Sequence, residues 1–535
     1  MNSHCFPFRQ IPHSTRLFLD YLDHSPSVQS FYPRSAHFLE WAQDEASRVH
    51  FPEDRRKRVA DILERQNKAF GASAKTLENI AAFRAGALAV VTGQQVGLFG
   101  GPVFSFYKAL TAVKLASEAG KLGVNCVPIF WLATEDHDLV EVNQVNVPGT
   151  EGQLEKLSIS VHSGEDAPVG TIHFGAEIRE LAQKAKELLG ETEFSNLLAE
   201  CYRPEESFGT AFAKLFARVF ADFGVIVLDS SDPELDAIAA PIYREVIERT
   251  PELNHALLNR GQELEAAEYE QQVRVTNTST PLFVIRDGSR IPVHMLSPDK
   301  FQVGKDELAK ADLLELAESN PQVFSPNVLL RPVVQDYLLP TLTYIGGAAE
   351  VAYFAQVAVL YESLSGRVTP VLPRFSATVI ETKPQALLEK YGLSFADLFQ
   401  GSDALREKIG SRLLDAKLQN SFDQAHAAVE RSMVAVREAL AQLDKTLIES
   451  AANAESKMIY QLTSLRSRAA RAELRQSEVA ERHAKLLSNA LYPDKTLQER
   501  EFAGMYFLAK HGRELLDGLL GTISPDCVDH QLITL

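Results

Sequence analysis

The sequence predicts a doubly wound α/β core that is interrupted by two inserted connecting pieces and followed by an α-helical coiled-coil domain. Three observations lead to this fold class. Short apolar runs alternate with amphipathic helical segments, which is typical of βαβ units in a parallel sheet. Two stretches, near 148–200 and 245–325, instead show the alternation of half-exposed strands. The stretch between Gly410 and Pro493 lacks glycine and proline and repeats apolar residues at heptad spacing.

The first βαβ unit follows an N-terminal part, residues 1–85, that is expected to be mostly helical. Ala85–Val91 and Val124–Leu132 are apolar runs that predict buried strands. Between them, Val103–Ala119 is amphipathic, starts after a proline and ends at a glycine, as helices commonly do. Because a strand, a helix and a second strand in this order form a βαβ unit, we expect the two strands to be parallel.

The inserted pieces have the pattern of antiparallel strands. In the first, Leu157–Val161 and Val169–Phe174 are predicted to pair; in the second, residues 272–295 form a hairpin with Asp287-Gly288 as its turn. Between the pieces, Gly224–Leu228 returns to the buried-strand pattern. The predicted division is 1–85 helical N-terminal part of the core, 86–147 first βαβ half, 148–200 inserted piece, 201–244 core, 245–325 second inserted piece, 326–395 core, 396–490 coiled coil, and 491–535 a C-terminal segment that packs back on the core.

The coiled coil is predicted from two heptad runs. The first consists of Val429, Met433, Val436, Leu440, Leu443 and Leu447, and the second of Met458, Leu462, Leu465, Ala469 and Ala472. The step from Leu447 to Met458 breaks the heptad, which indicates either a stutter in one helix or the turn of an antiparallel hairpin near Ala451–Ala454. We expect the heptads to form a homodimer.

The composition excludes several classes of protein. The chain has 535 residues, 45% hydrophobic and 23% charged, which are the values of a globular protein rather than a disordered one. Its net charge of −17 argues against nucleic acid or an anionic membrane as a partner, and no apolar run is long enough to span a bilayer. Four widely spaced cysteines predict neither a disulfide framework nor a zinc site, and they fit a cytoplasmic protein.

A glycine-rich turn, TGQQVGLFGGP at 92–102, follows the first predicted strand. Gly93 and Gly97 permit close approach of the backbone to a ligand, and Gln94 and Gln95 add donors and acceptors. Ligands bind at the carboxyl ends of such strands, but the turn matches neither the dinucleotide nor the P-loop signature. It is either a ligand-binding turn or a tight packing turn.

Four polar residues, Glu135, Asp136, His137 and Asp138, follow the second predicted strand directly. The carboxylates are expected to favour a protonated imidazole, which suits acid–base catalysis, an ammonium substrate or a metal ion. The alternative is a solvated loop that caps a helix. Because both motifs follow neighbouring strands, we expect them to face one pocket.

Further candidates lie in the second half of the chain. They are Arg331 and Arg374 as carboxylate clamps, Glu350 after the Gly-Gly pair at 346–347, and Tyr492 and Arg500 after the coiled coil. Each has a structural alternative: a surface charge for the arginines, an amphipathic helix for Glu350, and the end of a helix at Pro493 for the last segment.

Taken in order, these motifs resemble the bacillithiol biosynthesis cysteine-adding enzyme family. The glycine turn is followed by a helix with Tyr107-Lys108, then by FWLATEDHD, GGAAEVAYFAQ, the heptads and YPDKTLQER at 492–500, so the resemblance spans nearly the whole chain. It implies a Rossmann-like core similar to the catalytic domain of class I aminoacyl-tRNA synthetases, with a coiled coil that supports a homodimer. The implied activity is the last step of bacillithiol biosynthesis, in which L-cysteine is joined through its carboxyl group to the amine of glucosaminyl malate.

This reaction needs an activated carboxyl group, so ATP or another activating nucleotide is expected, together with a base for the amine proton. The HIGH and KMSKS signatures of the synthetases are absent, and the need for a metal stays open. The predicted roles are catalysis for His137, Asp136 and Glu135, carboxylate binding for Lys108, Arg331 and Arg374, and a nucleotide site near the coiled coil for Tyr492 and Arg500. The alternatives are a nucleotidyltransferase on the same core and a non-enzymatic coiled-coil scaffold with a vestigial nucleotide fold.

Overall fold

The computed structural model describes residues 1–149, 153–164, 166–476 and 478–535, and the chain forms two compact units. The Rossmann-like unit consists of Met1–Pro148, Glu155–Thr378 and Glu499–Ile533. The helical unit consists of Gly149–Leu154, Val379–Gln498 and Thr534–Leu535. Most of the helical unit is therefore one long insertion between two parts of the Rossmann-like unit. Within the described residues, no helix is both long and apolar enough to cross a membrane.

The Rossmann-like unit contains a five-stranded parallel sheet with the order β13-β12-β2-β3-β6, which confirms the predicted fold class. The strands are β2 (Leu88–Gln94), β3 (Cys126–Leu132), β6 (Ile226–Asp229), β12 (Thr341–Gly346) and β13 (Val371–Pro373). The chain runs outward from β2 through β3 to β6, and then returns to β12 on the other side of β2. Strand order therefore reverses between β2 and β12, and such a switch point is where doubly wound folds bind ligands.

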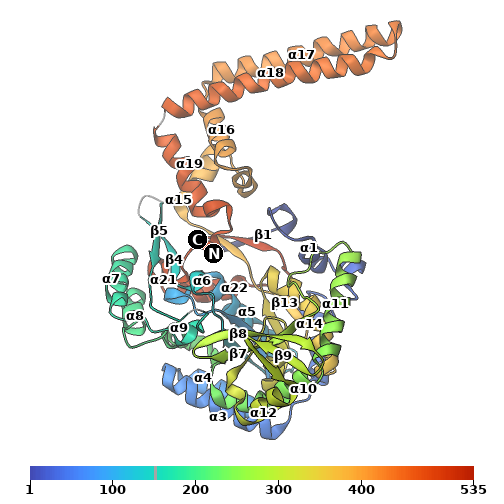
Figure 1. Ribbon diagram of the computed structural model, residues 1–535. Helices are drawn as coiled ribbons and strands as arrows, with labels where there is room; N and C mark the ends of the chain where they lie inside the picture. Colours follow the sequence, from blue (N-terminus) through green and yellow to red (C-terminus); the bar gives the residue numbers. More distant parts are fainter. Residues whose placement is uncertain (150–152, 165, 477) are drawn as a thin grey trace. The chain divides into compact units, whose positions relative to one another are not determined.

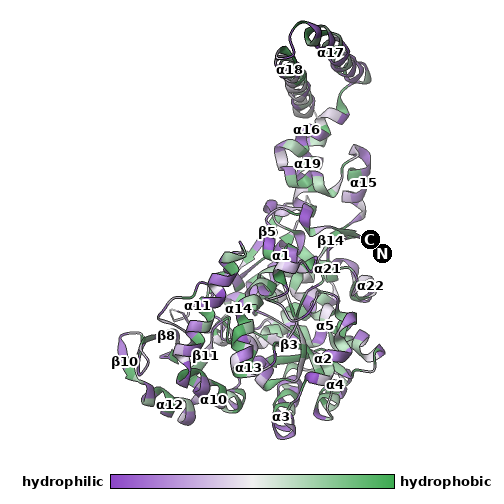
Figure 2. Ribbon diagram, turned by 90° about the vertical axis from the view of Figure 1, so that its right-hand side faces the viewer, coloured by the Kyte–Doolittle hydropathy of each residue, from purple (hydrophilic) through white to green (hydrophobic). Residues whose placement is uncertain are grey.

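The predicted βαβ unit is present as β2, α5 (Phe104–Lys121) and β3. Both strands are buried along most of their length, and they pair in register from Leu88 with Cys126 to Gln94 with Leu132. Figure 2 shows the hydrophobic colouring of β3, with α2 (Ala42–Arg48) and α5 to its right and α13 (Arg331–Leu338) and α14 (Ala348–Leu364) to its left. Side chains from α5 and the segment before α2 pack on the sheet in one buried cluster, which includes Trp41, Val90, Leu115 and Ile345.

The N-terminal part is helical, as the sequence predicts. Besides α2 it contains α1 (Arg16–Leu22), α3 (Glu53–Phe70) and α4 (Ala74–Arg84), preceded by a short strand, β1 (Asn2–Phe6). The α3 helix ends at Gly71, whose φ of 80° is the left-handed conformation that closes many helices.

The first inserted piece differs from the prediction. The strand β5 (Leu154–Ser158) pairs with β4 (Gln144–Pro148), not with residues 169–174. Val169–Thr171 is instead a single 3-10 turn that lies against the loop after β3, since Val169 N donates to Asp136 O and Gly170 N to Thr134 O. The helices α7 (Glu177–Leu189), α8 (Glu193–Cys201) and α9 (Phe208–Val219) then lead to β6.

The second inserted piece carries the predicted hairpin. The strands β7 (Ser279–Arg286) and β8 (Ser289–Ser297) are antiparallel, and their turn is Asp287-Gly288 with φ values of 52° and 78°. This sheet also contains β9 (Lys300–Val303), β10 (Asp306–Ala309) and β11 (Phe324–Pro326). In the sequence, α10 (Pro233–Glu248) and α11 (Thr250–Ala266) precede these strands, and α12 (Lys310–Ser319) lies between β10 and β11. Figure 1 shows β7, β8 and β9 side by side.

The helical unit contains a hairpin of helices, one of the two arrangements that the broken heptad left open. Its helices are α15 (Thr382–Tyr391), α16 (Ser402–Leu413), α17 (Ala416–Leu443), α18 (Leu447–Gln476) and α19 (Glu478–Leu491), and Figure 1 shows α17 and α18 side by side. The turn lies at 444–446 rather than 451–454, because the Asp444 carboxylate accepts hydrogen bonds from the backbone N and the hydroxyl of Thr446 and starts α18 early. The single continuous helix is therefore excluded.

The heptad residues are only partly covered within the hairpin. Met433 is buried, but Val436 is 42% exposed, Leu465 is 56% exposed and Leu443 is 79% exposed. One hairpin therefore leaves part of its apolar surface in solvent.

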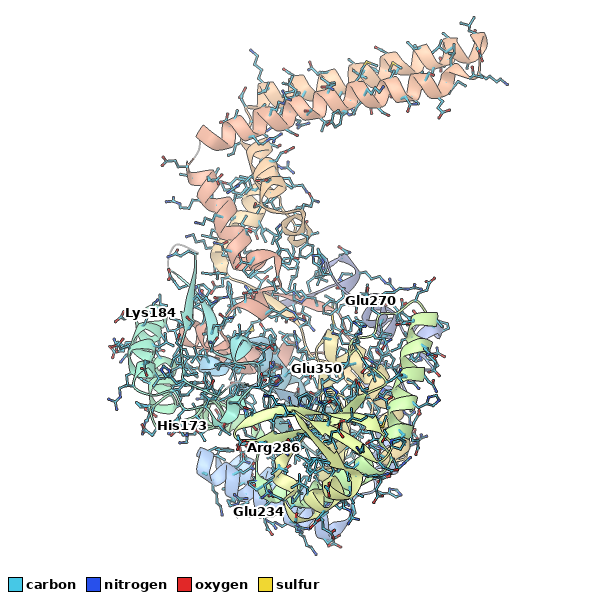
Figure 3. The ribbon with its side chains drawn as sticks, in the orientation of Figure 1. His173, Lys184, Glu234, Glu270, Arg286 and Glu350 are labelled. Carbon is cyan, nitrogen blue, oxygen red and sulfur yellow. A yellow bond between two sulfur atoms is a disulfide. The ribbon has the colours of Figure 1, made fainter. Side chains whose placement is uncertain are left out.

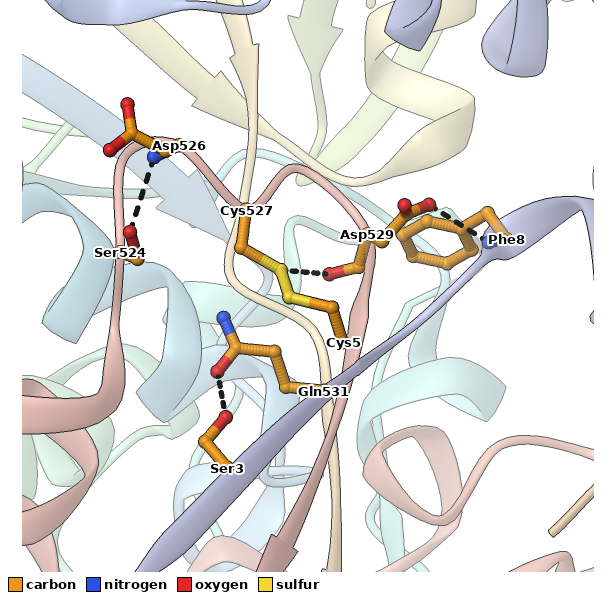
Figure 4. The surroundings of a disulfide bond; sticks show 8 residues. All are labelled: Ser3, Cys5, Phe8, Ser524, Asp526, Cys527, Asp529 and Gln531. Atoms are coloured by element: carbon orange, nitrogen blue, oxygen red, sulfur yellow. Dashed lines mark hydrogen bonds between the residues drawn. A yellow bond between two sulfur atoms is a disulfide. The ribbon is translucent and has the colours of Figure 1, made fainter.

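The C-terminal segment returns to the Rossmann-like unit through α21 (Gly504–His511), α22 (Glu514–Thr522) and β15 (His530–Thr534). Cys527 forms a disulfide with Cys5, and Ser3 donates a hydrogen bond to Gln531 close by (Figure 4). The expectation that the cysteines are unpaired is therefore wrong for this pair, while Cys126 and Cys201 are free thiols.

Candidate active site

A cavity of about 300 Å³ lies at the switch point of the sheet. It is lined by residues from the ends of β2, β3, β12 and β13 and from the segment after the helical insertion: Gly93, Gln94, Gln95, Phe104, Lys108, Trp131, Ala133, Glu141, Val328, Arg331, Tyr344, Gly347, Ala349, Glu350, Tyr353, Arg374 and Arg500. We call this the switch-point cavity. Figure 3 labels Glu350 near the middle of its unit in this view, whereas Glu234 lies at the lower edge.

The two halves of the glycine turn have different surroundings, and a ligand-binding role for the first half stays a prediction. Gly93, Gln94 and Gln95 line the cavity, and a Cβ atom at Gly93 would lie 2.9 Å from the backbone oxygen of Trp131, so only glycine fits between the strands. The second half packs against the protein. The Tyr202 hydroxyl donates to the backbone oxygen of Gly97 and accepts from the backbone N of Gly100, so this part offers no open cradle for an anion.

Lys108 is buried on α5 and fixes the positions of three residues that line the cavity. Its ammonium donates to Gly93 O at 2.7 Å and to Gln94 Oε1 at 2.9 Å, and it forms an ion pair with Glu350. Burial lowers the pKa of Lys108 to about 8, although Glu350 opposes the shift. Because three acceptors use all three N–H groups, Lys108 holds the site together rather than binding a substrate carboxylate.

Glu350 is likewise held by groups of the protein. Tyr344 donates to Oε1 at 2.6 Å, and the backbone N of Gly347 donates to Oε2 at 2.7 Å. Burial opposes its ionisation, but Lys108 and these hydrogen bonds outweigh burial and hold the pKa of Glu350 below its usual range. The carboxylate thus fills the N-terminus of α14, where an anionic ligand would otherwise find free N–H groups.

Two arginines of the cavity differ in how their charge is balanced. Arg374 is buried and forms a two-pronged ion pair with the buried Glu499, at 2.7 and 3.0 Å. Arg331 donates to the hydroxyls of Tyr344 and Tyr353 and to Gln335. Among the described residues, no carboxylate lies within ion-pair distance of Arg331, so its charge remains available to an anion.

Arg500 is the most open cation of the cavity. Its side chain is exposed, and within the described part of the chain no residue makes a hydrogen bond or an ion pair with its guanidinium. Tyr492, which we predicted to share a nucleotide site with Arg500, belongs to the helical unit, where its ring packs on that of Phe399 at 4.8 Å between centroids.

The loop after β3 meets the glycine turn, but Glu135, Asp136, His137 and Asp138 do not line the cavity, so the expectation that both motifs face one pocket is not confirmed. Gln95 Nε2 donates to Asp136 Oδ2 at 2.7 Å and to Glu141 Oε2 at 2.9 Å, so the two motifs adjoin at one edge of the sheet as predicted. Of these partners, only Gln95 and Glu141 reach the cavity. Asp138 accepts from the backbone N of Glu141 and caps the short helix α6 (Leu139–Val142), which is the structural alternative for this residue.

The carboxylates do not surround His137 as we expected. Glu135 points to the second inserted piece, where the buried Ser325 donates to its Oε2 at 3.0 Å. Burial, and to a smaller extent the charge of Asp229, raises the pKa of Glu135 to about 7, although Ser325 and Arg290 oppose the shift. The nearest side-chain partner of His137 is Arg290 of β8, whose Nη1 lies 3.3 Å from Nδ1. The catalytic roles of Glu135, Asp136 and His137 stay predictions.

Two family models match the chain. One, described as bacillithiol biosynthesis BshC, N-terminal Rossmann-like domain, matches residues 1–375. The other, described as bacillithiol biosynthesis BshC, C-terminal coiled-coil domain, matches residues 377–535. This chain belongs to the BshC family.

Several BshC relatives align with almost the entire chain. A protein of Koribacter versatilis named "Putative cysteine ligase BshC" is 47% identical over 532 residues, which are 99% of both chains. Proteins of the same name from Solibacter usitatus and Salinibacter ruber are 36% and 32% identical, covering 99% and 97% of this chain and 99% and 96% of their own. The two BshC models meet between 375 and 377, close to Thr378, where the Rossmann-like unit leads into the helical insertion.

Several residues of this BshC chain at or near the site were missed from the sequence. Phe104 and Tyr344 line the cavity, and Glu499, Arg290, Ser325 and Asp236 interact with Arg374 or with the loop after β3. Glu499 lay within a segment that we had singled out, next to Arg500, whereas Arg290, Ser325 and Asp236 carry no local motif. In the described residues, no group of three or more His, Cys, Asp or Glu side chains could hold a metal ion.

Proposed function

We propose that this BshC family member is a carbon–nitrogen ligase that joins L-cysteine through its carboxyl group to the amine of glucosaminyl malate, the last step of bacillithiol biosynthesis. The names of the relatives support a cysteine ligase. The substrate and the reaction step rest on the motifs of the sequence and on the chemistry of the switch-point cavity.

The observation that carries the proposal is the pair of arginines with available charge, Arg331 and Arg500, at one cavity of about 300 Å³. Malate has two carboxylates, and guanidinium groups bind carboxylates through paired hydrogen bonds. The aromatic walls Phe104, Trp131 and Tyr353 add apolar surface of the kind that packs on sugar rings. A dicarboxylate joined to an amino sugar therefore matches this site better than a cation or an apolar ligand does.

Amide formation from a free carboxylate is unfavourable in water, so we assign ATP or another activating nucleotide as co-substrate. The phosphates would compete for the same free guanidinium groups, since Glu350 already occupies the N-terminus of α14 and Tyr202 closes the second half of the glycine turn. The amine must also lose a proton, and Glu141 is a carboxylate of the cavity wall whose one assigned hydrogen bond, from Gln95, leaves acceptor capacity.

We also propose that the protein acts in the cytoplasm as a homodimer. The exposed apolar side chains of the helical hairpin support the dimer, because a coiled coil buries such residues against a partner helix.

The test uses the purified full-length chain with L-cysteine, glucosaminyl malate and ATP, followed by mass spectrometry of the thiol products. We expect bacillithiol, together with one cleaved nucleotide per amide bond. Expression in a bacterium that lacks its cysteine-adding enzyme should restore bacillithiol and remove accumulated glucosaminyl malate. Pyrophosphate release without an amide product would indicate a nucleotidyltransferase instead, and unchanged cellular thiols would support the scaffold.

A further inference from the structure

The imidazole of His137 lies between Arg290 of β8 and Asp136 of its own loop in the Rossmann-like unit. On one side, Arg290 Nη1 of β8 lies 3.3 Å from Nδ1. On the other, Asp136 of the same loop places Oδ1 3.7 Å from Nδ1, and its Oδ2 accepts from Gln95 at the end of β2. The ring of Phe283 on β7 lies 6.3 Å away between centroids.

Arg290 is fixed by contacts that have nothing to do with His137. Its Nε donates to the Ser325 hydroxyl at 3.0 Å, and its Nη2 donates to the backbone oxygen of Pro326 at 2.7 Å, both on β11. Its guanidinium lies 4.0 Å from the centre of the Phe283 ring. Because three contacts on one sheet orient the guanidinium, the direction in which Nη1 points is set by the fold.

The chemistry of the pair determines where the imidazole proton is. A guanidinium has only donors, so Nδ1 must present a lone pair to Nη1. A neutral imidazole with an unprotonated Nδ1 carries its proton on Nε2, whereas an imidazolium has N–H groups at both positions and would face Arg290 with a second donor. Asp136 does not reverse this preference, since its Oδ1 accepts from the backbone N of His137 at 2.7 Å and lies 3.7 Å from Nδ1, beyond hydrogen-bond distance.

The other ring nitrogen is open. The His137 side chain is 36% exposed, and none of the described residues forms a hydrogen bond with Nε2. It stands in the loop whose neighbours Ala133 and Glu141 line the switch-point cavity. An N–H group at this place can donate to a ligand but cannot accept a proton from one.

We propose that Arg290 is a positioning residue that holds His137 as the neutral Nε2–H tautomer, so that His137 acts as a hydrogen-bond donor to an anionic oxygen of the reactants and not as a general base. The tautomer follows from the geometry alone, while its use in catalysis rests on the proposed ligase function. Donors of this kind stabilise the oxyanion that forms when an amine attacks an activated carboxyl group.

The first test measures the tautomer without any reaction. In protein labelled with ¹⁵N-histidine, long-range ¹H–¹⁵N correlation spectra distinguish the two tautomers and the imidazolium, and the spectrum of His137→Gln identifies the signals of His137. We expect the Nε2–H form at pH 8. An Nδ1–H form or an imidazolium at this pH would overturn the proposal.

The second test removes the guanidinium with Arg290→Met, which keeps much of the side-chain volume. Without a donor facing Nδ1, the spectrum of His137 should then show a mixture of the two neutral tautomers instead of the Nε2–H form alone. Arg286→Met is the matched control, because Arg286 lies on the same sheet and pairs with Asp306 away from His137, so its spectrum should equal that of the parent protein. A His137 spectrum that Arg290→Met leaves unchanged would refute the positioning role, and if that variant does not fold, the parent spectrum still decides the tautomer.

The third test concerns catalysis. His137→Gln keeps an N–H donor of similar reach and should retain the reaction within about tenfold, whereas His137→Ala should lower kcat by about 10²–10³, the loss seen when one oxyanion donor is removed. Equal losses in both variants would contradict the donor role. Failure of the parent protein to form bacillithiol would refute the proposed function while leaving the spectroscopic result unaffected.

Discussion

The two arginines Arg500 and Arg374 line the same cavity, yet replacing each by glutamine should have opposite consequences. Arg500 is exposed and has no hydrogen-bond or ion-pair partner within the described residues, so Arg500→Gln should change the free energy of unfolding by no more than about 0.5 kcal/mol. Arg374 and Glu499 have side chains that are 6% and 1% exposed. Arg374→Gln leaves the Glu499 carboxylate buried with only the Ser376 hydroxyl and the backbone N of Ala377 as donors, which should cost about 3–5 kcal/mol.

Arg500→Gln, which should hardly change stability, should instead weaken the binding of the anionic substrate. A hydrogen bond from a charged donor is worth about 1.5–3 kcal/mol, so Arg500→Gln should raise KM for glucosaminyl malate by about 10- to 150-fold. Urea unfolding followed by circular dichroism measures stability, and product formation by mass spectrometry measures KM. Arg58→Gln is the control, since Arg58 is an exposed arginine of α3 outside the cavity, and it should change neither quantity.

Either of two results would refute this reasoning. If Arg500→Gln keeps KM within about twofold of the parent value, the open guanidinium does not contact the anionic substrate. If Arg374→Gln unfolds at the same urea concentration as Arg500→Gln, the buried pair with Glu499 does not stabilise the unit.

Three further predictions concern stability and assembly. Burial and the nearby Glu135 raise the pKa of Asp236, so the folded state keeps a proton that the unfolded chain releases above pH ~4, and the parent protein loses stability as pH rises. Asp236→Asn, which can still accept a hydrogen bond from Tyr243, should therefore be stabilising, and more so at pH 8 than at pH 5. The exposed Asp517→Asn should show no such trend, and an equal gain for Asp236→Asn at both pH values would contradict the raised pKa. Gly93→Ala should lower the free energy of unfolding by about 1–3 kcal/mol and remove activity, because its Cβ would press on Trp131 O. Gly120→Ala on α5 is the control and should be neutral or stabilising, since the added Cβ meets no atom within 4 Å. Equal stability of the two variants would disprove the close approach of β2 and β3. Val436→Asp combined with Leu465→Asp should convert the dimer to a monomer in light scattering, and a parent protein that is already monomeric would end the dimer proposal.

The sequence predicted those parts of the fold whose signals are local. The apolar runs became β2 and β3, and Asp287-Gly288 became a hairpin turn, because a few adjacent residues suffice to favour each structure. The position of the helical turn was wrong, since α17 ends just before Asp444, whose backbone is extended and whose carboxylate accepts from Thr446 N at the start of α18, and this turn needs neither glycine nor proline. The pairing of β5 was also wrong, because a half-exposed strand pattern does not say which strand is its neighbour.

The cavity residues that were predicted either belong to motifs or, like Arg331 and Arg374, were chosen for their charge alone. Gly93, Gln94 and Gln95 line the cavity as expected. Arg290 lies 153 positions from His137, and Glu499 lies 125 positions from Arg374. The sequence around His137 or Arg374 therefore does not indicate which residue will be its partner. The expected imidazolium followed from counting acids beside His137, whereas the fold turns Glu135 and Asp138 to other partners.

Because the helical unit is inserted between Arg374 and Glu499, the residues that form the cavity are synthesised at different times. A ribosome adds about 5–20 residues per second, so the 125 positions between these residues take about 6–25 s to synthesise. During that interval, Arg374 has no carboxylate to pair with, and Arg500 has not yet been made. A nascent chain that stops within the coiled coil would thus contain every strand of the central sheet and still lack the groups that complete the cavity. Arg500, and the pairing of Arg374 with Glu499, therefore become available only after the helical insertion has been translated.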